Sequence, residues 1–233
     1  MVPTKHIRKN CRWRVTPLPI HKPMISISTV IFDYGNVLCQ PQPFEILQEM
    51  ASLCGIPTPQ FQASYYQFRH QYDLGVLDGS GYWQAFGSVA GFQIPESTIN
   101  QLIELDNQSW AQPNWPMIEW VTRLQTAGIQ TAILSNMPVD MRRELSSLCH
   151  WLPKCDVEVF SCELGIAKPD LAIFEHCLGH LRVVPKEALF LDDRLENVKA
   201  AQALGLHGLV FESVELLGAE LAGRFHLPPV LSK

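Results

Sequence analysis

Short apolar runs alternate along most of this chain with segments of helical period, a pattern that predicts buried strands joined by helices. Strands are predicted at 28–32, 129–134, 157–160, 188–191 and 206–211. Helices are predicted at 116–126, 139–148, 169–179, 194–204 and 213–224. Nearly continuous apolar strands separated by helices are typical of a parallel sheet covered on both faces. The chain is therefore predicted to be an α/β protein with a doubly wound, Rossmann-like parallel sheet.

The stretch between residues 40 and 112 has no strand pattern and reads as helices only. They are predicted at 44–54, 60–73, 82–89 and 96–108. Because this block follows the first strand, it is expected to lie over that strand's end as a helical cap. The predicted domains are a core formed by 25–40 and 113–233, a cap over 41–112, and an N-terminal extension over 1–24.

The N-terminal extension is basic, whereas the rest of the chain is acidic. Residues 1–24 contain six Lys or Arg and no acidic residue, and their four prolines prevent one long amphipathic helix. We expect a disordered extension, with Met24 an alternative start and a targeting or anionic-surface role as the other interpretation. Residues 25–233 keep 12 basic against 23 acidic residues, a net charge of −11. An acidic body of this kind does not suggest a nucleic-acid-binding protein.

Cysteine usage and hydropathy bear on the compartment. The seven cysteines are an odd number, and none of them forms a C-x-x-C pair. This pattern favours reduced thiols and a cytoplasmic protein over a disulfide framework or a zinc site. Since no apolar stretch approaches the roughly 18–20 residues that a membrane span needs, no membrane partner is expected.

Two fragments place polar side chains just after predicted strands. Asp33 follows the run at 28–32, and Ser135 and Asn136 follow the strand at 129–134. In open α/β sheets, ligands bind at the carboxyl ends of the strands. Each of these residues taken alone also fits a turn or a helix cap, because Asp, Ser and Asn favour both positions.

Two further fragments carry charge. Lys168 precedes Pro169 at a predicted helix start, where the helix dipole does not favour a cation. A bound anion or a nearby carboxylate explains it, and so does a solvated surface position. Asp192 and Asp193 follow the strand at 188–191, and adjacent carboxylates repel each other unless a cation neutralises them. Such oxygen ligands suit Mg²⁺, although either residue also fits the cap of the next helix.

Together, the four fragments resemble the motifs of the haloacid dehalogenase-like (HAD) superfamily. FDYGNVL resembles its first motif, ILSN its second, GIAKPD its third and FLDDRLENVKAAQALG its fourth. The resemblance spans about residues 28–212, and the helical block lies where the family carries a C1-type cap. The D-x-G-N-V form of the first motif resembles a capped phosphatase branch that includes sugar-1-phosphate phosphatases.

The resemblance implies a role for each matching residue. Asp33 would attack phosphorus and form an aspartyl-phosphate, and Lys168 would neutralise both the phosphate and this nucleophile. Ser135 and Asn136 would hold the phosphoryl group. The implied cofactor is Mg²⁺, with Asp33, the Gly35 carbonyl and Asp193 as ligands and Asp192 supporting the metal's waters. The implied reaction is hydrolysis of a small phosphorylated metabolite, such as a sugar phosphate.

Position 35 departs from the family pattern. The family has an Asp two residues after the nucleophile as general acid and base, and this chain has Gly35 there. General acid–base catalysis is worth roughly 10²–10⁴-fold in rate, so the loss predicts slow turnover or a preference for good leaving groups. A substitute acid from the cap or the substrate is the other interpretation.

Two alternatives to a phosphatase follow from the same departure. A dehalogenase of the 2-haloacid type also lacks the second Asp, uses no metal, and places an Arg of the cap beside the halide. The only Lys or Arg between Lys22 and Arg123 is Arg69, which would contact a substrate anion or pair with Asp73 one helical turn away. The Asp192–Asp193 pair argues against this alternative, because it would be uncompensated without a metal. The other alternative is a HAD-fold binding protein that has lost catalysis.

Overall fold

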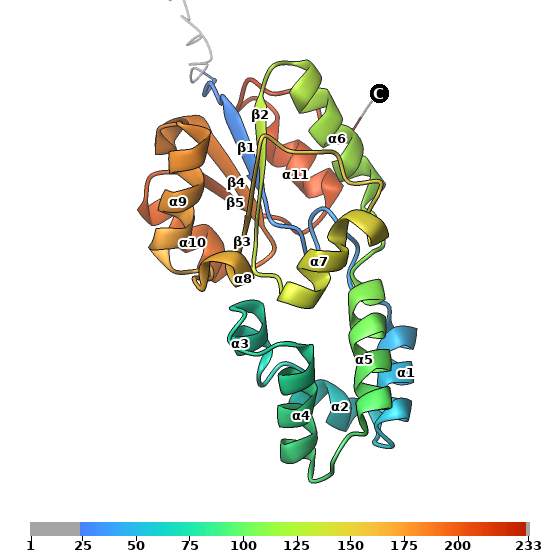
Figure 1. Cartoon of the computed structure of the whole chain (residues 1–233). Helices are drawn as coiled ribbons and strands as arrows, with labels where there is room; N and C mark the ends of the chain where they lie inside the picture. The colour runs from blue at the N-terminus through green and yellow to red at the C-terminus, as the bar shows by residue number, and fades with distance from the viewer. Residues whose placement is uncertain (1–23, 232–233) are drawn as a thin grey trace, which may run out of the picture.

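The computed structural model describes residues 24–231, which form a five-stranded parallel sheet with helices on both faces (Figure 1). Residues 1–23 of the basic leader lie outside the described residues. The disorder predicted for this segment therefore stays a prediction. Within residues 24–231, no helix combines the length and the apolar character that crossing a bilayer requires.

The sheet has the strand order β3-β2-β1-β4-β5. Its strands are β1 (Thr29–Phe32), β2 (Gln130–Ser135), β3 (Val157–Phe160), β4 (Ala188–Asp192) and β5 (His207–Val210). The chain runs outward from β1 through β2 to β3, and then crosses to the other side of β1 for β4 and β5. Phe32 of β1 lies beside Ile133 of β2 and Leu191 of β4, so these three strands end at one edge. The predicted doubly wound sheet is confirmed, with β1 at its switch point.

Helices cover both faces of the sheet because successive strand residues point to opposite sides. Val30 and Phe32 of β1 belong to one buried cluster, and Ile31 belongs to the other. The first cluster packs under α6 (Trp115–Thr126), α7 (Val139–Leu148) and α11 (Val214–Leu221). The second packs under α9 (Leu171–Leu181) and α10 (Leu195–Ala203). The short helices α8 (Ser161–Leu164) and η1 (Pro185–Glu187) complete this part of the chain.

A helical insertion (residues 41–112) separates β1 from α6, as expected. It comprises α1 (Phe44–Leu53), α2 (Thr58–Tyr65), α3 (Arg69–Asp73), α4 (Gly79–Ala90) and α5 (Glu96–Ser109). The insertion has a hydrophobic cluster of its own, in which six aromatic side chains are fully buried: Phe61, Tyr65, Tyr72, Tyr82, Trp83 and Phe86. It lies beyond the carboxyl ends of the strands, with α3 facing α8 (Figure 1). Most of its aromatic residues therefore stabilise the insertion itself.

Two elements differ from the sequence-based prediction. The single helix predicted over 60–73 is two helices, α2 and α3, separated at residues 66–68. There the N–H groups of Gln67 and Arg69 bond carbonyls three residues back, which tightens the turn and ends α2. The four-residue helix α8 was not predicted, since so short a segment has no helical period to detect.

Candidate active site

Asp33 stands at the end of β1, in the centre of the sheet. Its main-chain N–H donates to Leu191 O of β4 at 2.8 Å, so the ladder holds the residue at the strand edge. Its carboxylate oxygen Oδ1 accepts from the main-chain N–H of Tyr34 at 2.7 Å. The side chain is 11% exposed, and that exposed part faces a cleft. The residue is therefore rigid yet accessible to a ligand.

Lys168 lies between two carboxylates. Its Nζ is 2.9 Å from Asp33 Oδ1 and 2.7 Å from Asp192 Oδ2, and its side chain is buried. Burial alone would lower the pKa of this ammonium group, but the two carboxylates raise it above its usual value. The structure thus resolves the two interpretations of Lys168, because it is a buried charged partner of the carboxylates and not a solvated surface residue.

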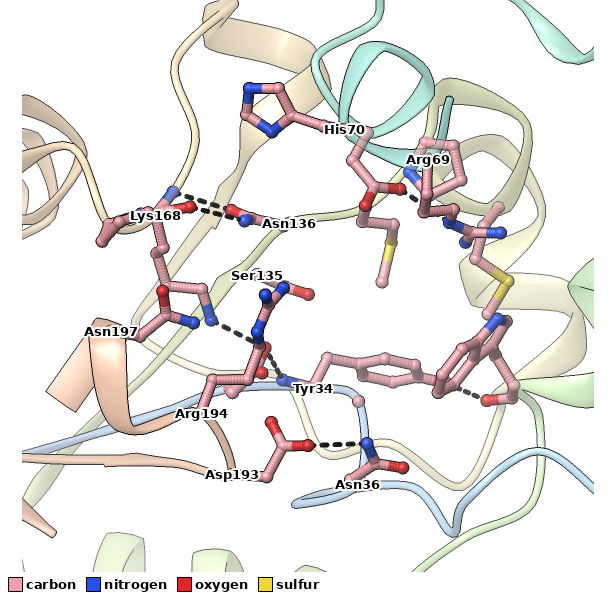
Figure 2. A pocket seen from close by; sticks show the side chains of 18 of the residues that line it. Tyr34, Asn36, Arg69, His70, Ser135, Asn136, Lys168, Asp193, Arg194 and Asn197 are labelled. Atoms are coloured by element: carbon pink, nitrogen blue, oxygen red, sulfur yellow. Dashed lines mark hydrogen bonds and ion pairs between the residues drawn. The ribbon is translucent and has the colours of Figure 1, made fainter. Parts of the chain in front are cut away.

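Asn136 fixes the main chain of Lys168. Its Oδ1 accepts from the Lys168 N–H and its Nδ2 donates to the Lys168 carbonyl, both at 2.9 Å (Figure 2). This reciprocal pair joins the end of β2 to the loop that carries Lys168. Ser135 also lines the cleft, and its hydroxyl has no partner among the described residues. The serine is thus free to donate to a ligand, whereas the amide of Asn136 is largely committed to positioning Lys168.

The carboxylates of Asp33, Asp192 and Asp193 converge, with one oxygen of each within 4.8 Å of the others. The ammonium of Lys168 balances only one of the three negative charges. Asp192 is fully buried and accepts bonds from Lys168, the Arg194 N–H and Asn197 Nδ2. These bonds commit Asp192 to orienting its neighbours.

Asp193 is the more open member of the adjacent pair. It is half-buried and accepts from Asn36 Nδ2 at 2.7 Å (Figure 2). Burial raises the pKa of Asp193, while this hydrogen bond lowers it. Asn36 reaches it from a left-handed backbone conformation, φ 59°, which Asn tolerates better than most residues. An oxygen-rich, negatively charged group of this kind has the donor set and the charge that fit Mg²⁺.

The electrostatics of Asp33 reflect the same imbalance. Burial raises its pKa to about 7, Lys168 opposes this, and the carboxylates of Asp192 and Asp193 raise it further. A divalent cation at the carboxylates would favour the ionised form of Asp33, because an adjacent positive charge lowers a carboxyl pKa.

Gly35 lines the cleft two residues after Asp33. A Cβ at this position would lie 3.5 Å from Cζ3 of Trp110, an ordinary contact distance. The indole of Trp110 therefore lies against this point of the backbone and leaves room for a Cβ there. Metal binding by the Gly35 carbonyl stays a prediction.

Arg69 is held inside the insertion by two carboxylates. Its Nε is 3.0 Å from Asp73 Oδ1 and its Nη1 is 2.8 Å from Asp106 Oδ2. Nη1 also donates to the hydroxyl of Tyr65, and the guanidinium lies over the ring of Tyr72. The predicted pairing with Asp73 is confirmed. Asp106 was missed because it lies 37 residues away in the sequence. Arg69 also lines the cleft, where a substrate would bind. Its contact with a substrate anion stays a prediction.

One cleft of about 610 Å³ is lined by all of the predicted site residues except Asp192, which is fully buried behind Lys168. Figure 2 shows Ser135, Lys168 and Asp193 around it, with Arg69 and His70 of α3 along its upper side. Sequence reasoning assigned no site role to several other lining residues from the insertion and the α7 region: His70, Asp73, Trp110, Met137, Pro138 and Met141. These residues lie in helices and loops, and the hydrophobic pattern of the sequence does not distinguish them from other positions.

Relatives of this chain include both a phosphatase and a larger enzyme. It is 28% identical over 184 residues to the sesquiterpene phosphatase astK of Aspergillus oryzae, covering 79% of this chain and 89% of that protein. It is 29% identical over 216 residues to mouse acyl-CoA dehydrogenase family member 10, covering 87% of this chain but only 20% of that protein. The chain thus spans about a fifth of the mouse protein's length.

Solved structures share the fold. A HAD family enzyme of Bacteroides thetaiotaomicron, bt-2542, in complex with magnesium and inorganic phosphate, has a TM-score of 0.63 and 19% identity, covering 79% of this chain and 94% of that one. The L-2-haloacid dehalogenase of Xanthobacter autotrophicus has a TM-score of 0.60 and 21% identity, covering 87% and 85%.

The sequence model of the haloacid dehalogenase-like hydrolase family matches residues 27–205, which contain the whole carboxylate–lysine cluster. This protein therefore belongs to the haloacid dehalogenase-like hydrolases.

Proposed function

We propose that this protein is a Mg²⁺-dependent phosphatase that hydrolyses a small phosphorylated metabolite through an aspartyl-phosphate on Asp33. The observation that carries the proposal is the convergence of three carboxylates, of which two contact the single ammonium group of Lys168. This arrangement leaves two negative charges, which a divalent cation would neutralise. A dehalogenase that uses no metal has no need of such a cluster.

The proposed roles follow from the positions of the residues. Asp33 is the nucleophile, and Lys168 neutralises the phosphoryl oxygens from its place beside Asp33 Oδ1. Ser135 donates its hydroxyl to the phosphoryl group, and Asn136 holds the loop of Lys168. Asp33, Asp193 and the Gly35 carbonyl hold Mg²⁺, with Asp192 as an outer support. The metal supplies charge neutralisation at the phosphate.

The substrate class rests on the cleft and on the relatives. The cleft of about 610 Å³ suits a small molecule, and its walls combine the charged cluster with Trp110, Met137 and Met141. A relative named as a sesquiterpene phosphatase supports an organic phosphate. A sugar phosphate is the other candidate. The insertion acts as the cap over this substrate. The six cysteines among the described residues are free thiols, which supports a reducing compartment such as the cytoplasm.

The direct test is hydrolysis of 4-nitrophenyl phosphate by the purified protein, with Mg²⁺ and with chelator. We expect Mg²⁺-dependent turnover that falls to background in Asp33→Asn, because the amide is not a nucleophile. Asp78→Asn is the matched control, since Asp78 caps α4 outside the cleft and Asn is an equally good N-cap. Absence of turnover in the wild type would favour the dehalogenase or the binding protein, and turnover of 2-chloropropionate without metal would identify the former.

A further inference from the structure

The leaving group needs a proton that position 35 does not provide. In phosphoryl transfer, the attacking and leaving oxygens lie roughly in line on opposite sides of phosphorus. Asp33 attacks from the sheet, so the leaving oxygen points across the cleft toward the insertion. There α3 faces the ends of the strands (Figure 1). A substitute acid is therefore expected on the insertion side.

Besides Arg69, which holds its proton too tightly to act as an acid, three titratable side chains of the insertion line the cleft on that side. Tyr66 is 59% exposed, and burial of its remainder raises a pKa that is already high, so it is a poor acid. His70 is exposed and has no hydrogen bond or ion pair with another side chain in residues 24–231, which leaves its ring unpositioned. Asp73 is the third, and it differs from both because its position is fixed.

Asp73 is anchored at both its side chain and its main chain. Its Oδ1 accepts from Arg69 Nε at 3.0 Å, and its carbonyl accepts a hydrogen bond from the hydroxyl of Ser161 at the start of α8. The second bond ties the end of α3 to the core domain. Oδ2 has no partner among the described residues. A carboxyl group held in this way is pre-organised, with one oxygen free to donate a proton.

The acidity of Asp73 suits this task. Burial raises its pKa to about 6, Arg69 opposes this, and Asp106 raises it further. The charged and titratable groups around it are Arg69 and His70 of α3, Tyr82 of α4, Asp106 of α5 and Cys162 of α8. General acids work best when their pKa lies near the operating pH. Arg69 also stabilises the carboxylate that remains after the proton has left.

We infer that Asp73 is the general acid of this enzyme, replacing the carboxyl group absent at Gly35; this inference rests on the proposed phosphatase function. As Asp33 Oδ forms its bond to phosphorus and the ester P–O bond breaks, the proton of Asp73 passes to the leaving oxygen and releases an alcohol. The Asp73 carboxylate then takes a proton from water as the water oxygen attacks phosphorus. This step releases inorganic phosphate and restores Asp33 and the protonated Asp73.

The test compares two substrates of similar shape, 4-nitrophenyl phosphate and benzyl phosphate. The nitrophenolate leaves without a proton, whereas the benzyl alkoxide needs one. Asp73→Asn should lower kcat/KM for benzyl phosphate about 10²-fold more than for 4-nitrophenyl phosphate. Asp106→Asn is the matched control, because it also breaks an ion pair of Arg69 yet keeps Asp73. It should change the ratio of the two substrates far less than Asp73→Asn does, because it shifts the pKa of Asp73 without removing the carboxyl group.

Rescue provides a second readout. Gly35→Asp in the Asp73→Asn protein should restore benzyl phosphate turnover, since a Cβ at position 35 meets Trp110 at an ordinary distance. Equal losses on both substrates in Asp73→Asn would make Asp73 merely structural and overturn the inference. A selective loss of benzyl phosphate turnover in His70→Gln, and not in Asp73→Asn, would also overturn it. The same holds for a wild type that is inactive on benzyl phosphate but active on 4-nitrophenyl phosphate. A wild type inactive on both would remove the phosphatase proposal and the inference with it.

Discussion

At the scale of single residues, the site contains more carboxylates than positively charged groups. The ammonium group of Lys168 contacts both Asp33 and Asp192, whereas Asp193 accepts a hydrogen bond from Asn36 instead. Replacing Lys168 by an apolar residue would leave buried carboxylates without a counter-charge, which is more damaging than the loss of an exposed ion pair. Lys168 is thus needed for the local structure, in addition to the phosphate-binding role proposed for it above.

Asp73 gives a pH dependence of stability with a definite sign. Its pKa rises from 3.8 to about 6 on folding, so the folded state holds this proton more tightly than the unfolded state. The corresponding stability is fully present below about pH 4 and is lost as the pH rises through about 6. A shift of about two units corresponds to roughly 3 kcal/mol. The unfolding free energy of the wild type should therefore fall relative to Asp73→Asn between pH 4 and pH 7.

Urea unfolding of the two proteins at pH 4, 5, 6 and 7 measures this difference directly. A gap between wild type and variant that stays constant over this range would show that Asp73 titrates as it does in the unfolded chain. In that case its burial would not influence its acidity.

Sequence reasoning found some residues of the site and missed others for a physical reason. Asp33, Ser135, Asp192 and Asp193 follow apolar strands, and the parallel topology brings strand ends together, so their proximity was predictable. Asp73 and Asp106 meet Arg69 only because α3 and α5 pack side by side in the insertion. No periodicity encodes such a contact between distant segments.

At the scale of elements, the insertion is joined to the core by few polar contacts. Asp140, in the first turn of α7, accepts at Oδ2 from the Tyr72 hydroxyl at 3.0 Å and from the Gly79 N–H at 2.8 Å. The Ser161 hydroxyl bonds the Asp73 carbonyl, as described above. Where the insertion rejoins the core, the Tyr34 hydroxyl and Trp151 Nε1 donate to the carbonyls of Trp110 and Ala111. The insertion has a separate hydrophobic cluster, so these contacts, rather than a shared core, fix α3 over the cleft.

Removal of the Asp140 carboxylate should loosen this connection. Asp140→Ala leaves the Tyr72 hydroxyl and the Gly79 N–H without their acceptor, at a cost of about 2 kcal/mol for the two hydrogen bonds. We expect hydrogen exchange of the amides in α3 to accelerate about 30-fold, while those in β1 keep their rates. Tyr72→Phe, which loses one of the two bonds, should give an intermediate effect. Unchanged exchange in α3 would mean that apolar packing alone holds the insertion closed.

The break between α2 and α3 shows why element boundaries in the insertion were harder to predict than those of the sheet. A continuous helix over 60–73 satisfies local propensity, whereas the observed turn at 66–68 leaves Tyr66 exposed beside the cleft. It also sets Arg69 against Asp106. The tertiary ion pair outweighs a local preference of a few tenths of a kcal/mol per residue. The central strands β1 and β4 have no such competitor, because every one of their residues is buried.

At the scale of the whole molecule, the protein is acidic, and its three converging carboxylates raise the negative charge at the end of the sheet. Folding brings these carboxylates within a few ångströms of one another, so their repulsion opposes the folded state. A cation that binds only the folded protein relieves this repulsion and stabilises the whole chain by mass action. Metal binding should therefore be measurable as stability, independently of turnover.

We expect Mg²⁺ to raise the thermal unfolding midpoint, since a ligand at one hundred times its dissociation constant adds about 2.7 kcal/mol. Asp193→Asn should remove most of this shift, because Asp193 is the most exposed of the three carboxylates and the one not bonded to Lys168. It should also raise the metal-free midpoint, because one of the repelling charges is gone. The matched variant Asp78→Asn should keep the full Mg²⁺ shift. If Asp193→Asn responded to Mg²⁺ as the wild type does, the ion would bind elsewhere and the carboxylate cluster would need another explanation.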